Sequence, residues 1–262
     1  MLNMQRIALA LTIAVPFASL DDQARACDVV HVIAYQHTAG SELSVWVNDA
    51  VVFRALPGGS GGSATPRFLI NGTNTVSAIL DPGSAEAPKA RLEVFDGCEG
   101  EFPFPVGENE NVLASLALDG DNSAQTSFEL TGQPETAWST AEPADDDAGL
   151  LDAAQALIAA AKAQDVDAYV GAFKPMLADM AARGMPAEQM LASMAAGVFS
   201  EMEVVDPKPL SARAILGGRV WEVTDADGKA PLQFQGPGGE ADSLEQGMYW
   251  VHDGSSWGVV RQ

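Results

Sequence analysis

The spacing of apolar and polar positions changes along the chain and separates a strand-rich region from a helical one. Between residues 27 and 132, short apolar runs rich in β-branched residues are divided by turn-forming pairs such as Asn71-Gly72 and Asp119-Gly120. The predicted strands are 31–35, 43–47, 50–54, 67–70, 75–80, 90–95, 112–118 and 125–130. Eight short strands without a helix predict an all-β sandwich.

Beyond residue 148 the residue composition is first typical of helices and then typical of strands. Alanine, methionine and leucine dominate, and the predicted helices are 150–161, 165–173, 175–183 and 186–202, the first capped by Asp146 or Asp147. The predicted strands that follow are 203–205, 211–216, 219–224, 231–235, 246–252 and 257–261. Helices followed by a curved antiparallel sheet predict an α+β domain in which the sheet leaves a cone-like cavity.

The segment 133–147 has two prolines, five acidic residues and neither lysine nor arginine. This composition is typical of a linker, although Trp138 is unusual in a free tether and is expected to dock on a domain. The predicted organisation is therefore a β-sandwich domain at 27–132, an acidic linker at 133–147 and an α+β cone-like domain at 148–262.

The first 26 residues have the layout of a signal peptide. Arg6 precedes an apolar stretch at 7–20, which is shorter than the roughly 20 residues that a membrane span needs, and Ala24-Arg25-Ala26 offers a small-x-small cleavage site. We expect export, a periplasmic or secreted mature chain starting at Cys27, and no transmembrane segment in that mature chain.

The chain has two cysteines, Cys27 and Cys98. Cysteine pairs in exported proteins usually form disulfides, so a Cys27–Cys98 bridge is predicted. The alternative is a lipoprotein anchored through Cys27, but Arg25 does not fit a lipobox. The cysteines and the histidines His31, His37 and His252 show no ligand spacing, so neither a metal site nor a cofactor is predicted.

The formal net charge is −22. This charge repels phosphate backbones and anionic membranes, which argues against nucleic-acid binding. The favoured interpretation is a solubility adaptation, and the alternative is attraction of cations or of a basic partner.

Three glycine- or aspartate-rich segments invite a ligand-binding interpretation. The run 57–63 lacks the Gly-Lys-Ser/Thr ending of a phosphate loop and predicts a flexible loop. The turns 119–122 and 225–228 lack the sixth-position glycine and twelfth-position glutamate of a helix-loop-helix calcium site. Asp119, Asp121 and Asn122 remain candidates only for a weak cation site on a β-turn.

Two resemblances extend this picture. The opening helix that ends in 161–173 and the closing hairpin 247–262 resemble the nuclear-transport-factor-two-like superfamily, which includes polyketide cyclases and ketosteroid isomerases. The methionine-rich insert 176–202 departs from that pattern. The segments 43–53 and 68–80 loosely resemble jelly-roll and immunoglobulin-like accessory modules, which often bind carbohydrate or protein.

The cone-like resemblance implies a cavity with a carboxylate base and a hydrogen-bond donor. The weak candidates are Glu222, His252 and Tyr169, but they form no diagnostic motif, so no catalytic residue is assigned. Trp221, Phe234, Trp250 and Trp257 are candidates for an apolar ligand site, although core packing is the favoured interpretation. Core packing is also favoured over an adaptable groove for the methionines, which are Met176, Met180, Met185, Met190, Met194 and Met202.

The sequence thus favours an exported, non-enzymatic binding or accessory protein that binds a partner protein or a small apolar ligand. One alternative is a small hydrolase, isomerase or cyclase working in the cone, with Glu222 or His252 as base. The other is a carbohydrate-binding protein in which Trp46 forms a stacking platform.

Overall fold

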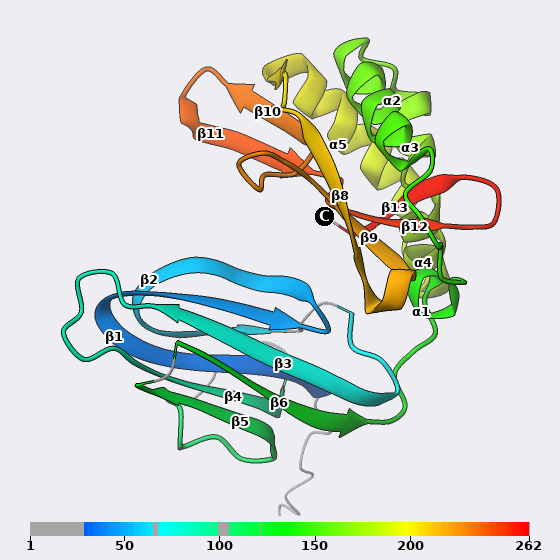
Figure 1. The fold of residues 1–262 in the computed structure, drawn as a ribbon. Helices are drawn as coiled ribbons and strands as arrows, with labels where there is room; N and C mark the ends of the chain where they lie inside the picture. Colours follow the sequence, from blue (N-terminus) through cyan, green and yellow to red (C-terminus); the bar gives the residue numbers. More distant parts are fainter. Residues whose placement is uncertain (1–28, 65–67, 99–104, 121, 262) are drawn as a thin grey trace, which may run out of the picture.

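The computed structural model describes residues 29–64, 68–98, 105–120 and 122–261. The protein is mostly β, with strands β1–β6 on one side and the helices and remaining strands on the other (Figure 1). Within the described residues, no helix is long and apolar enough to cross a membrane. The predicted signal peptide and Cys27 lie outside the described residues.

The first six strands form a curved antiparallel sheet. They are β1 (Val29–Val47), β2 (Ala50–Ala64), β3 (Gly72–Asp81), β4 (Lys89–Cys98), β5 (Val112–Asp119) and β6 (Ser123–Leu130). The order is β5-β4-β1-β3-β6, and β2 also pairs with β1. The first half of β1 pairs with β4 and the second half with β3, and β5 approaches β6, so the sheet is nearly closed.

Alternation along these strands fills the interior of the sheet. In β1, Leu43, Val45 and Val47 are buried, whereas the intervening Ser44 and Trp46 are partly exposed. The inward residues join Val76, Leu92 and others in one apolar cluster. This alternation is typical of an antiparallel sheet that buries one face in a core.

The glycine-rich run 57–63 is not the predicted flexible loop, because β2 continues through it. Gly59 and Gly61 pair with His37 and Tyr35 of β1. A Cβ atom on Gly58 would lie 2.5 Å from the Cα of Ala39, so glycine allows the two backbones to approach closely. The low strand propensity of glycine concealed this strand in the sequence.

The predicted strand 67–70 is also absent in its described part. Phe68 has a φ of 60°, which an extended strand does not allow. The buried amide of Asn48 donates to the Phe68 carbonyl at 2.8 Å and to Asn74 Oδ1 at 2.8 Å. Asn74 in turn hydrogen bonds with the backbone N–H and carbonyl of Ile70. This amide pair holds the loop that carries Phe68.

The second part begins with α1 (Ala137–Thr140), α2 (Leu150–Lys162), α3 (Val166–Gly171), α4 (Lys174–Ala182) and α5 (Ala187–Glu201). The strands are β7 (Glu203–Val205), β8 (Leu210–Ile215), β9 (Val220–Asp225), β10 (Leu232–Gly236), β11 (Gly239–Gln246), β12 (Tyr249–His252) and β13 (Trp257–Arg261). They form the sheets β11-β10-β7 and β13-β12-β9-β8. Helices α2 to α5 begin and end within two residues of the predicted bounds, although Gly149, and not an aspartate, is the N-cap of α2.

The sheet β13-β12-β9-β8 is apolar on both faces. Trp250 and Val223 pack against the helices. Their neighbours Tyr249 and Val251 belong to a separate cluster that also contains Ala50 and Phe68 of the first part. The two parts of the chain therefore share a buried core, and the segment that joins them contributes Trp138 to it.

Trp138 docks as predicted and is only 5% exposed. Its ring meets Phe68 edge to face at 5.2 Å between ring centroids, and Phe68 meets Tyr249 in the same way at 4.9 Å. The segment 133–147 is therefore held by packing around α1 instead of running as a free tether.

The predicted Cys27–Cys98 disulfide remains a prediction, because Cys27 is not described. Val29, the first described residue, is the register partner of Cys98 in the β1–β4 ladder. The chain thus enters the described region two residues from Cys27 and directly beside Cys98.

The close approach of β1 and β2 predicts the effect of adding a methyl group at Gly58. Because the clashing atoms are backbone atoms, Gly58→Ala should destabilise the protein by about 1–3 kcal/mol in urea unfolding. Gly197→Ala is the control: this helical glycine has nothing within 4 Å, so alanine should be neutral or stabilising by about 0.5–1 kcal/mol. Equal stabilities of Gly58→Ala and the parent protein would contradict the paired geometry.

Candidate functional site

An apolar groove lies between α4, α5, α1 and β13. Its volume is about 330 Å³. We call it the methionine groove, and it is lined by Thr136, Trp138, Met176, Asp179, Met180, Arg183, Ala187, Met190, Leu191, Met194 and Val260.

The sequence of α5 explains one wall of this groove. Ala187, Leu191, Ala195 and Phe199 recur every four residues and are buried against the core. Met190 and Met194 lie beside this stripe, and they are 48% and 59% exposed. Long apolar side chains in this position border the groove instead of filling the core.

The favoured core interpretation of the methionines is therefore only partly right. Met176, Met180 and Met202 are partly buried and pack against the helical core. Met185, Met190 and Met194 are exposed. Met190 and Met194 instead line a groove, as the alternative interpretation expects.

The opposite wall of the groove is fixed by the segment that joins the two parts. Thr136 caps α1 in a reciprocal capping box with Ser139, and the N–H of Ala137 donates to Asp179 Oδ1 of α4 at 2.7 Å. Trp138 lines the groove and also packs on Phe68. Asp179 and Arg183 supply charged groups to the lining.

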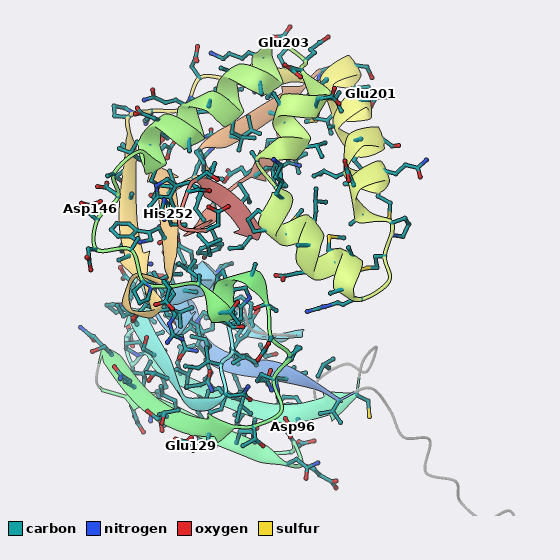
Figure 2. All side chains as sticks on the ribbon, turned by 90° about the vertical axis from the view of Figure 1, so that its right-hand side faces the viewer. Asp96, Glu129, Asp146, Glu201, Glu203 and His252 are labelled. Carbon is teal, nitrogen blue, oxygen red and sulfur yellow. The ribbon has the colours of Figure 1, made fainter. Side chains whose placement is uncertain are left out.

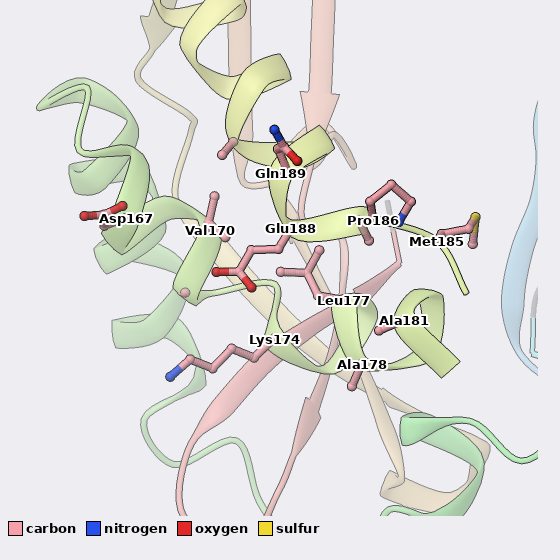
Figure 3. Close-up of a pocket in the computed structure, with 13 residues that line it drawn as sticks. Asp167, Val170, Lys174, Leu177, Ala178, Ala181, Met185, Pro186, Glu188 and Gln189 are labelled. Carbon is pink, nitrogen blue, oxygen red and sulfur yellow. The ribbon is translucent and has the colours of Figure 1, made fainter. Parts of the chain in front are cut away.

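A second, more open pocket of about 930 Å³ lies on the other side of α4. Figure 3 shows the charged groups of Asp167, Lys174 and Glu188 on one side and Met185 and Pro186 on the other. The mixture of opposite charges and small side chains does not define one ligand chemistry.

The weak catalytic candidate Glu222 is buried, with 4% exposure, but it does not face the helices. Alternation along β9 places it with Val220, on the face that packs against the first sheet. Arg213 donates to its Oε2 from Nη2 at 2.6 Å and from Nε at 3.1 Å. Arg54 Nη2 lies 3.8 Å from Oε1. Glu222 is thus the acidic centre of an ion cluster between the two parts of the protein.

The other two catalytic candidates lie elsewhere. Tyr169 is buried among the helices and donates a hydrogen bond to Gln246, and burial raises the pKa of its hydroxyl. His252 is half-buried beside the 253–256 turn, with its ring edge to face against Trp257 at 5.0 Å. The three candidates therefore occupy the helical core, the opposite face of the sheet and the end of a strand, and the fold does not bring them together.

The four aromatic candidates for an apolar ligand site do not line the pockets described here. Trp250 and Phe234 are fully buried in the helical core, as the favoured interpretation predicts. Trp221 and Trp257 are partly buried and meet edge to face at 6.1 Å. The indole N–H groups of the three tryptophans donate to the carbonyls of Gly247, Gly218 and Ala148.

The Asp225 turn closes a hairpin by hydrogen bonds. The Asp225 carboxylate accepts from the N–H groups of Asp227 and Lys229 and from the Gln233 amide. Burial would raise the pKa of Asp225, but these hydrogen bonds hold it below its usual value. Among the described residues, no group of three or more His, Cys, Asp or Glu side chains is placed to hold a metal ion, and Asp121 lies outside that set.

The negative charge is spread over the molecule. Figure 2 shows Glu201 and Glu203 at the helical end and Asp96 and Glu129 near the opposite end. Acidic side chains therefore lie at both ends of the molecule.

The arrangement was compared with known proteins. No family model, no curated protein and no solved structure matches the chain. The function therefore has to be argued from the site itself.

The ion cluster predicts that breaking the ion pair of Glu222 costs more stability than breaking an exposed ion pair. Glu222→Gln should destabilise the protein by about 1–3 kcal/mol, because it removes the charge of a buried carboxylate that pairs with Arg213 and lies near Arg54. Lys89→Gln, which breaks an exposed pair with Asp119, should cost less than about 1 kcal/mol. Urea unfolding compares the two, and equal costs would contradict a buried structural role for Glu222.

The Asp225 turn predicts a pH effect. Its pKa is lower in the folded than in the unfolded chain, so ionised Asp225 stabilises the fold above the ordinary aspartate pKa of about 4, and this stabilisation is lost as the pH falls further. Asp225→Asn should therefore be less stable than the parent protein at pH 7. The difference in stability between the two proteins should become smaller as the pH falls toward 3. Thermal unfolding across this range measures it, and a constant difference would refute the assignment.

Proposed function

We propose that the chain is an exported, non-enzymatic binding protein that holds a small apolar ligand in the methionine groove. The observation that carries the proposal is the exposure of Met190 and Met194 beside a groove of about 330 Å³. Exposed large apolar side chains around a concavity mark ligand or partner sites in proteins.

The dimensions and lining of the groove favour a small molecule. Pockets for small ligands usually measure about 300–1,000 Å³ and are mainly apolar with a few polar groups. Methionine side chains are flexible and polarisable, so they adapt to ligands of different shape. Arg183 and Asp179 would orient a polar group of a ligand whose apolar body contacts Met180, Leu191 and Trp138.

The positions and partners of the candidate catalytic groups also support a binding function. Glu222 is paired with Arg213, Tyr169 is paired with Gln246, and His252 lies at a strand end. An acid–base mechanism needs such groups within reach of one reacting atom.

The proposal includes the export and the architecture predicted from the sequence. Residues 1–26 act as a signal peptide, the mature chain is periplasmic or secreted, and Cys27 bridges to Cys98. The β-sandwich at 27–132 and the cone-like α+β unit at 148–262 act as two domains, joined by the shared core around Trp138. The short distance along the chain between Cys27 and Val29, the partner of Cys98, supports the bridge.

Titration with the neutral apolar fluorophore N-phenyl-1-naphthylamine tests the binding function. We expect saturable binding with a micromolar Kd, and at least about tenfold weaker binding in Met190→Gln and Met194→Gln, because glutamine keeps the length of the side chain but not its apolar character.

Met185→Gln is the matched control. Met185 is also exposed, at 38%, but it lines the pocket on the other side of α4. The control should bind like the parent protein. Absence of saturable binding, or equal affinities of all three variants and the parent, would overturn the proposal.

A further inference from the structure

A second concave site lies on the outer face of the first sheet, where Arg213 of β8 approaches it. Its volume is about 530 Å³. We call it the Trp46 pocket, and it is lined by Trp46, Asp49, Ser77, Ala78, Ile79, Ser123, Ala124, Gln125 and Arg213. It shares no lining residue with the methionine groove.

The register of the strands builds the floor of this pocket. Trp46 of β1 pairs with Ser77 of β3, and Ser77 pairs with Gln125 of β6, so the three side chains form a row across the sheet. Ile79 and Ser123 form part of the next row on the same face. An aromatic ring and an exposed aliphatic side chain thus stand beside two hydroxyls and an amide on a rigid sheet.

Arg213, whose side chain is about half exposed, is held over this floor by the buried carboxylate of Glu222. Its Nη2 and Nε donate to Glu222, and Nη2 also donates to the carbonyl of Asp49 at 2.9 Å. Within the described part of the chain Nη1 makes no hydrogen bond, so its two N–H groups remain available to a ligand.

Glu222 is the least expected member of this arrangement. Its Oε1 is buried and has no hydrogen-bond partner among the described residues, although Arg54 lies 3.8 Å away. Burial of a carboxylate costs free energy unless an opposite charge and hydrogen bonds compensate, and Arg213 supplies both to Glu222. Glu222 is therefore a positioning residue, which fixes the guanidinium of Arg213 at the edge of the Trp46 pocket.

We propose that the Trp46 pocket binds a neutral carbohydrate. A sugar ring presents C–H groups on its faces and hydroxyls around its edge, so it needs an aromatic surface together with side chains that both donate and accept hydrogen bonds. Trp46 and Ile79 supply the apolar surface. Ser77, Ser123, Gln125, Asp49 and Arg213 supply donors and acceptors.

The charges select a neutral sugar over an anionic one. Glu222 offsets the charge of Arg213, Asp49 adds a carboxylate to the pocket, and the whole chain carries a net charge of −22. A phosphate or a uronic acid would meet repulsion from Asp49 and from the protein as a whole.

Isothermal titration with neutral gluco-, manno-, galacto- and N-acetylglucosamine tetrasaccharides tests the proposal. We expect at least one to bind the full chain with a Kd below about 1 mM. Binding should weaken at least tenfold in Trp46→Ala, less in Trp46→Phe, which keeps an aromatic ring, and about three- to tenfold in Gln125→Ala.

Gln125 is exposed on the edge strand β6, so its variant keeps the test valid if Trp46→Ala fails to fold. Met190→Gln is the control, because it alters the other groove and should leave sugar binding unchanged. The proposal is overturned if none of the four tetrasaccharides binds, or if Gln125→Ala and Trp46→Phe both bind as tightly as the parent protein. If the protein binds a sugar but not the fluorophore, the proposed ligand site in the methionine groove is wrong and the proposed sugar site is retained.

Discussion

The sheet β13-β12-β9-β8 carries apolar side chains on both faces, and the rest of the structure depends on covering both of them. The helices bury Trp250 and Val223 on one face. On the other face, Phe68 packs edge to face against Tyr249 and Trp138. Burial of apolar surface is the main force that stabilises a fold. Exposure of either apolar face of this sheet to water would therefore destabilise the protein. The first six strands provide the missing cover, and the loop that carries Phe68 is held by Asn48 and Asn74.

Both proposed sites lie where this cover meets the second part of the chain. Trp138 links the shared core to the wall of the methionine groove. On the polar border of the same contact, Glu222 and Arg213 bring β8 to the outer face of the first sheet. Sites built on packed elements keep their side chains in place more accurately than sites on free loops do. The same packing explains why Glu222 has a structural role although its burial resembles that of a catalytic carboxylate.

The sequence predicted those elements that depend on local periodicity. Helices α2 to α5 and most strands appear where the spacing of apolar residues places them, because burial of one face follows directly from a period of 3.6 or 2. The glycine strand of β2 was missed, since its contact with β1 depends on a close tertiary approach and not on propensity. Glu222 was a weak catalytic candidate in the sequence, which does not show that the first sheet covers its side chain. The exposure of Met190 and Met194 was not predicted either, because it depends on how far α4 lies from α5.

Occupation of the methionine groove by an apolar molecule is the central claim, and native mass spectrometry of the full chain purified from the cells that produce it measures this occupation most directly. The account predicts a species whose mass exceeds that of the protein by one small apolar molecule. This adduct should be lost when Met190→Gln and Met194→Gln are combined. The protein mass alone in every preparation, or an adduct that the double variant retains, would contradict the account.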